Sequence, residues 1–149
     1  MPKLQYDDIY KKITMLNATR SKNEHLTQAR AKQLSNLIFR YVSVQEFNLI
    51  TQDLNREMTN QELAKLIVAS ANGNDISEVA PVSPDLNIAL KFRYVRRQKG
   101  FSQKQVADTV GIMTEHQIEE AESKQIVPTF GEWSQLFRAI GRSIHFKFV

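Results

Sequence analysis

Apolar residues recur every three or four positions through the first half of the chain, the spacing of helices that bury one face. Two helices follow from this pattern on either side of the polar stretch TRSKNEH. The residues that carry it are Tyr6, Ile9, Tyr10, Ile13, Leu16, Leu26, Leu34, Leu37 and Ile38. Two more helices begin at capping boxes, Ser43 with Glu46 and Thr59 with Glu62, each followed by a helical apolar repeat. The sequence therefore predicts a small helical bundle in residues 1–72.

The stretch NGNDISEVAPVSP, residues 72–84, interrupts the helical pattern. It is rich in turn-forming residues and carries two prolines, which cannot donate to a helix ladder. We expect residues 73–83 to form an exposed linker and residues 84–149 to form a second domain. Ser83-Pro84 offers a start for a helix that runs to Gly100.

The segment FSQKQVADTVGIMTEHQIEEAESK, residues 101–124, has the spacing of a helix-turn-helix. Capping boxes at Ser102 and Thr114 begin its two helices. Ala107 is small enough for the close helix contact, and Gly111 tolerates the positive φ that the turn requires.

Residues 84–149 resemble the phage-repressor (Xre-type) helix-turn-helix family through RRQKGFSQ, QVADTVG, TEHQIEEAES and PTFGEWSQLFRAIG. In the last motif Phe130, Trp133, Leu136, Phe137 and Ile140 match the family's final apolar helix. The resemblance implies a mainly α chain whose second domain has five helices and a short C-terminal β-strand. Met113 lengthens the turn by one residue relative to the family pattern. The first half of the chain lies outside the resemblance.

The resemblance also implies roles for individual residues, because the second helix of such a motif enters the major groove of DNA. The residues expected near base edges are Glu115, His116, Gln117 and Glu120. Those expected near phosphates are Arg93, Arg97, Gln103, Lys104, Lys124 and Gln125. Glu122 matches a position that pairs with an arginine of the preceding helix, here Arg96, and is expected to form a structural ion pair.

Charge along the chain is segregated. The formal net charge is +4, and five cations without an acid lie in LKFRYVRRQKG, residues 90–100, whereas residues 115–122 hold four acids and no lysine or arginine. The cations favour an anionic partner such as nucleic acid, although a solvated basic face has the same composition. The acids leave a second interpretation open, a protein-interaction module that does not read DNA.

The chain ends in RSIHFKFV, where Ile144, Phe146 and Phe148 alternate with polar residues at the period of a strand. A lone strand needs a partner ladder, and pairing with the same strand of a second copy would give a homodimer. Pairing within the chain or a disordered end is the alternative. A dimer would present two reading helices to half-sites roughly 34 Å apart on double-stranded DNA.

These observations predict a cytoplasmic, dimeric DNA-binding regulator, either an autorepressor or the antitoxin of a toxin–antitoxin pair, with residues 1–72 serving assembly or a protein partner. We expect no enzyme, cofactor or metal site. The chain has no cysteine, no glycine-rich phosphate loop, and no companion at metal spacing for His25 or His145. It also has no apolar run of the roughly 20 residues that span a bilayer, so we expect no membrane association.

Overall fold

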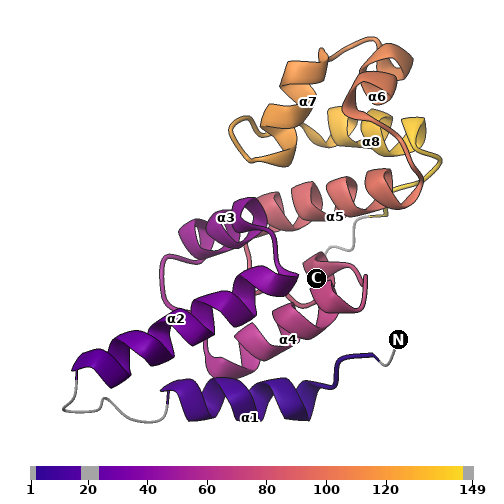
Figure 1. The fold of residues 1–149 in the computed structure, drawn as a ribbon. Helices are drawn as coiled ribbons and strands as arrows, with labels where there is room; N and C mark the ends of the chain where they lie inside the picture. The colour runs from indigo at the N-terminus through magenta and orange to yellow at the C-terminus, as the bar shows by residue number, and fades with distance from the viewer. Residues whose placement is uncertain (1–2, 18–23, 146–149) are drawn as a thin grey trace. The chain divides into compact units, whose positions relative to one another are not determined.

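The computed structural model describes residues 3–17 and 24–145, with the backbone alone for residues 24–26. These residues are mainly α-helical (Figure 1). The elements are α1 (Tyr6–Asn17), α2 (Glu24–Tyr41), α3 (Val44–Leu54), α4 (Asn60–Ala71), the 3-10 turn η1 (Ile76–Glu78), α5 (Pro84–Gln98), α6 (Gln103–Val110), α7 (Glu115–Glu122) and α8 (Phe130–Ala139). The chain divides into two compact units, Met1–Ser83 and Pro84–Val149.

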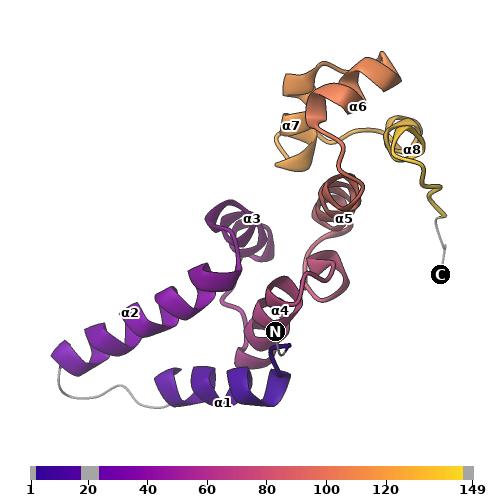
Figure 2. The same cartoon turned by 45° about the vertical axis from the view of Figure 1, so that its right-hand side comes forward.

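In the first unit, α4 lies against both α1 and α2, as Figures 1 and 2 show. Its buried residues include Ala64 and Ala69, whose small side chains allow neighbouring helices to approach closely, and Leu66 and Ile67, which are fully enclosed. Ile13 of α1 is also fully buried. The unit therefore has an apolar core of its own.

The two capping boxes predicted in this unit differ. At Thr59 the box is complete: the hydroxyl accepts from the Glu62 amide at 3.1 Å, and the Glu62 carboxylate accepts from the Thr59 amide at 2.9 Å. At Ser43 the hydroxyl accepts from the Glu46 amide at 3.1 Å, but the Glu46 carboxylate accepts from the Ser43 hydroxyl instead of the Ser43 amide. Ser43 thus caps α3 through one half of the expected motif.

Residues 73–83 belong to the first unit rather than forming an exposed linker. Ile76 and Ser77 of η1 are buried. The Ser83 amide and hydroxyl both donate to the Asp53 carboxylate, each at 2.7 Å. The turn-forming composition was interpreted correctly as an interruption of helix, but two buried side chains and a carboxylate partner attach the segment to its own unit.

The second unit has four helices within its described residues, not the five expected. Residues 123–129 form turns and irregular structure, because Lys124 adopts a left-handed φ of 61° and Pro128 cannot donate a helix hydrogen bond. The core brings Phe92 of α5 within 5.6 Å of Trp133 and 5.3 Å of Phe137, measured between ring centroids. Phe130 departs from the expected apolar face of α8, since it is 64% exposed.

The predicted C-terminal strand is not seen in the described residues: 142–145 are irregular, and Ile144 is half-buried. Phe146 and Phe148 lie outside the described residues. A strand is held by hydrogen bonds to a neighbouring strand, and the described part of this single chain offers none. No described helix combines the length and apolar character needed to cross a bilayer.

Candidate nucleic-acid interface

Helices α6 and α7 pack against each other as a helix-turn-helix. Ser102 caps α6 through a complete box with Gln105, whose side-chain oxygen accepts from the Ser102 amide at 2.8 Å. Gly111 ends α6 in the left-handed conformation, with φ of 68°, and its amide donates to the Ala107 carbonyl. A residue with a Cβ would be strained at this backbone angle, so glycine is what lets the chain turn here.

Met113 takes up the extra residue of the turn. Its side chain is 8% exposed, whereas that of the preceding Ile112 is 46% exposed. The chain therefore buries the second of two consecutive apolar residues and leaves the first at the surface. The sequence pattern did not indicate which of the two would face inward.

The ion pair between Arg96 and Glu122 is present and buried. Arg96 donates from Nε to Glu122 Oε2 at 2.7 Å and from Nη2 to Oε1 at 2.9 Å. Its Nη1 donates to the Phe101 carbonyl at 2.8 Å. The Glu122 side chain is 1% exposed. One guanidinium thus joins α5, the loop that precedes α6, and the end of α7, which fixes the second helix of the motif on the unit.

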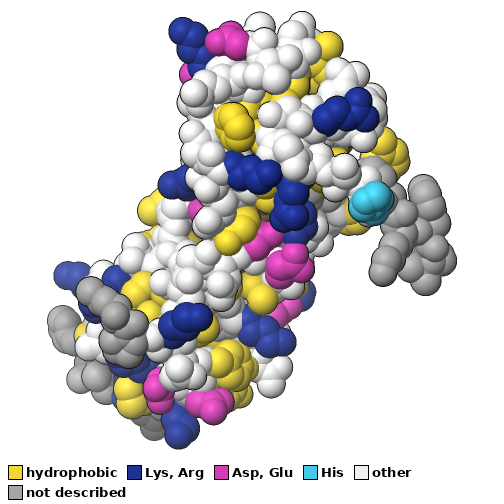
Figure 3. Space-filling view, turned by 90° about the vertical axis from the view of Figure 1, so that its right-hand side faces the viewer, with side chains coloured by type: hydrophobic (Ala, Val, Ile, Leu, Met, Phe, Trp, Pro, Cys, Tyr) yellow, Lys and Arg dark blue, Asp and Glu magenta, His cyan; other side chains and the backbone are white. Residues whose placement is uncertain are grey.

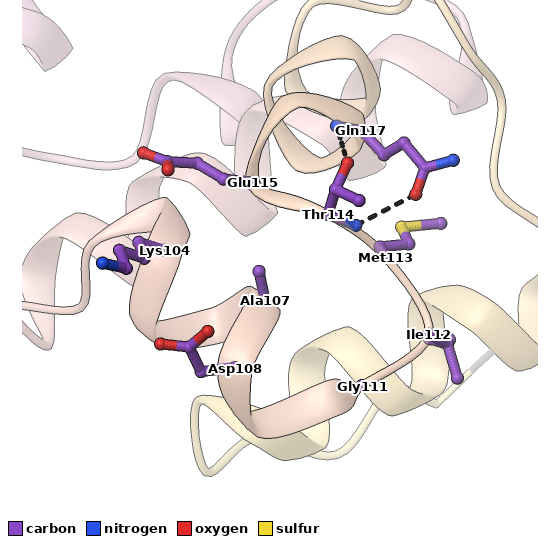
Figure 4. Close-up of a pocket in the computed structure, with 9 residues that line it drawn as sticks. All are labelled: Lys104, Ala107, Asp108, Gly111, Ile112, Met113, Thr114, Glu115 and Gln117. Carbon is purple, nitrogen blue, oxygen red and sulfur yellow. Dashed lines mark hydrogen bonds between the residues drawn. The ribbon is translucent and has the colours of Figure 1, made fainter.

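The first turn of α7 is exposed to solvent. Thr114 caps the helix, and its hydroxyl accepts from the Gln117 amide at 3.1 Å, while the Gln117 side-chain oxygen accepts from the Thr114 amide at 2.9 Å (Figure 4). Glu115, His116 and Gln117 are all exposed. The structure therefore places three of the four predicted base-contacting residues at a free helix N-terminus.

Glu120, the fourth predicted base-contacting residue, lies one turn further along α7. Its carboxylate is 3.1 Å from Nε2 of His116, and Glu119 lies 3.9 Å from Nδ1 of the same ring. The Glu120 side chain is 25% exposed, against 61% for Glu119. The imidazole therefore lies between two carboxylates on the outer face of the helix.

The basic cluster of α5 does not act as one surface. Arg96 is committed to the ion pair, and Lys99 donates to the Gly141 carbonyl at 3.3 Å, next to the C-terminus of α8. Arg93 is half-buried, and Arg97 is exposed. Of the two α5 residues predicted to contact phosphate, Arg97 is the accessible one.

The other predicted phosphate-contacting residues also differ in their exposure. Gln103 is half-buried, and its side-chain amide donates to Glu122 at 3.4 Å, so it faces the ion pair. Lys104 and Gln125 are exposed, and Lys124 is half-buried in the turn after α7. The described geometry leaves Lys104 as the accessible cation on the motif helices themselves.

A hollow lies between α6 and α7 and includes Lys104 in its lining. Its lining residues are Lys104, Ala107, Asp108, Gly111, Ile112, Met113, Thr114, Glu115 and Gln117 (Figure 4). Lys104 and Asp108 project from successive turns of α6, and Glu115 starts α7 beside them. Sequence reasoning missed Asp108, although its place one helical turn after Lys104 could have indicated it. On the face drawn in Figure 3, cations lie among acids and neutral groups.

No three histidine, aspartate or glutamate side chains of the described residues come together as a metal-binding group. Comparisons with protein-family models, curated proteins and solved structures found no significant match to this chain.

Proposed function

We propose that the chain is a sequence-specific DNA-binding regulator that reads the major groove with the first turn of α7. The observation that carries the proposal is the exposed N-terminal turn of α7, presented by a helix-turn-helix whose far end is locked by Arg96 and Glu122. Such a helix can enter a groove about 12 Å wide without rearranging the rest of the unit. The positive end of its dipole also favours the approach of an anionic backbone.

Phosphate binding in this proposal rests on Lys104 and Arg97, with Lys124 and Gln125 at the turn after α7. These residues supply cations and donors on α5, α6 and the loop, and phosphate contacts set orientation while base contacts set sequence. A homodimer would double these contacts and match a palindromic site. The regulator would act as an autorepressor or as the antitoxin of a toxin–antitoxin pair.

The first unit would serve a protein partner, such as a toxin or another subunit of a complex. Its separate core supports an independent role. Phe39 and Val44 are exposed to 41% and 55%, and exposed apolar side chains of this size are favourable contacts for a protein surface.

The acids around the hollow favour a second candidate, a protein-interaction module that binds a basic partner. Asp108 and Glu115 line the hollow and are exposed, as is Glu119 further along α7, and Lys104 is the cation among the hollow's lining residues. Carboxylates beside phosphates repel them, whereas the same carboxylates attract lysine and arginine side chains. The two candidates therefore make opposite predictions for removal of the Lys104 charge.

The test is fluorescence anisotropy of the protein with DNA from immediately upstream of its own gene and with a scrambled fragment, at two salt concentrations. Lys104→Gln removes the central cation of the motif, and Lys65→Gln removes one exposed lysine from α4 as a matched control. We expect preference for the upstream fragment, a steep loss of affinity with salt, and weaker binding for Lys104→Gln alone.

Equal and weak binding to both fragments would reject the DNA-reading proposal. If Lys104→Gln then strengthened binding to a basic peptide while Lys65→Gln did not, the acidic-surface candidate would take its place. A matched effect of both substitutions on DNA would indicate nonspecific charge attraction and would also contradict sequence reading by this motif.

A further inference from the structure

Gln117 has a side chain whose orientation is fixed by the backbone. Its side-chain oxygen accepts from the Thr114 backbone amide at 2.9 Å, and its backbone amide donates to the Thr114 hydroxyl at 3.1 Å. A backbone N–H can only be accepted by an oxygen, so the side-chain NH₂ group is the end that remains available. The residue is exposed at the first turn of α7 (Figure 4). Towards a ligand, Gln117 therefore presents its NH₂ group, while its oxygen is turned towards the Thr114 backbone.

This restricts which base edge Gln117 can satisfy. A free glutamine pairs with adenine by donating to N7 and accepting from N6, which requires both ends of the amide. Guanine presents two acceptors, O6 and N7, and no donor at the same edge. The outward NH₂ group has two hydrogens and matches the two acceptors of guanine, whereas the N6 amino group of adenine needs an acceptor that here is turned towards Thr114.

We infer that Gln117 selects guanine over adenine because the capping box turns its oxygen towards the Thr114 amide and its NH₂ group outwards. The inference rests on the proposed DNA reading and names the base class that the same site takes. Leaving a polar group of the wrong base unpaired costs about 1–3 kcal/mol, which corresponds to a preference on the order of tenfold.

Gln117→Glu tests the reading role separately from the structural role. Glutamate at this position keeps the capping box, since a carboxylate oxygen still accepts from Thr114, and it suits the positive end of the helix. The outward donor becomes an acceptor, however. The same substitution at Gln105 makes an identical change in the capping box of α6, where the Ser102 amide donates to the side-chain oxygen. Gln105→Glu is therefore the matched control for added charge.

The experiment selects binding sites from random double-stranded DNA with the full-length wild type, Gln117→Glu and Gln105→Glu, after circular dichroism has verified equal helicity. We expect guanine at one position of the site for the wild type and for Gln105→Glu. For Gln117→Glu we expect that position to change to cytosine, whose N4 amino group donates to a carboxylate, with the guanine preference reduced on the order of tenfold.

Identical selected sites for the wild type and Gln117→Glu would overturn the inference and leave the proposed function standing, because another residue would then read the base. Selection of adenine by the wild type at a position that Gln117→Glu alters would also overturn it. A wild type that enriches no sequence would remove the proposed function, and the inference would fall with it.

Discussion

Replacing Arg96 with alanine should destabilise the second unit strongly, even in the absence of DNA. The change removes three hydrogen bonds at once, two to Glu122 and one to the Phe101 carbonyl. The Glu122 carboxylate would remain at a position where its side chain is 1% exposed. Gln103 at 3.4 Å would be its one remaining side-chain donor among the described residues.

The expected magnitude follows from this geometry. Removing one partner of a buried ion pair typically costs about 3–5 kcal/mol, because the other charge stays buried without compensation. We expect the lower part of this range, about 3 kcal/mol, since Gln103 still donates to the carboxylate. Arg97 is the next residue on α5 but is exposed, so Arg97→Ala should change stability by about 0.5 kcal/mol or less.

Urea denaturation followed by tryptophan fluorescence would measure the effect in the correct unit. Trp133 is the single tryptophan of the chain, is 3% exposed, and lies against Phe92 and Phe137 in the core that α8 completes. A third variant that combines Arg96→Met with Glu122→Leu should regain most of the lost stability, because it buries apolar groups instead of an unpaired carboxylate.

Equal unfolding midpoints for Arg96→Ala and Arg97→Ala would refute the reasoning, since they would mean that the buried carboxylate carries no penalty. A double variant less stable than Arg96→Ala would refute its second step, the assignment of the cost to the unpaired charge.

Two further predictions concern the other unit and the C-terminal tail. The Arg56 guanidinium, together with the Thr59 amide, lowers the pKa of Glu62 from 4.5 to about 2. The stabilising contribution of the Glu62 carboxylate should therefore be complete above pH 4.5 and be lost as the pH falls towards 2. The difference in urea midpoint between wild type and Glu62→Gln, followed by circular dichroism, should narrow over that range, and a constant difference would contradict the assignment. Truncation after Gly141 should give monomers in analytical ultracentrifugation if the tail forms the dimer, and a dimer that persists would place the interface elsewhere.

The helices were predictable from sequence wherever an apolar repeat coincided with a local stop or start signal. Thr59, Ser102 and Thr114 each begin a helix with the expected box, and Gly111 ends one with the expected positive φ. These features depend on residues within four positions of one another, so local sequence determines them. Because these signals agree with the apolar pattern, the mainly α fold was predictable from the sequence.

The predictions failed where contacts between residues far apart in the sequence determine the local structure. Residues 73–83 look like a linker in isolation, but Asp53, thirty positions earlier, binds both donors of Ser83. A strand at the C-terminus would require a partner ladder, which no local pattern supplies. Phe130 has helical spacing with Trp133 and Phe137, yet it remains 64% exposed. Each case depended on contacts with other residues, which the spacing of apolar and polar positions does not predict.

The sequence located the helices of the candidate site but not the partners of their side chains. The resemblance assigned DNA contacts to Gln103 and Gln117, and in the structure both side chains also take part in the fold, one towards Glu122 and one towards Thr114. Alanine at either position would remove a structural hydrogen bond together with any contact to DNA, so weaker binding would have two explanations. Substitution by glutamate at Gln117 keeps the structural bond and inverts the outward group. Specificity can then be assigned to a single atom, the side-chain nitrogen, while the helix that carries it is held constant.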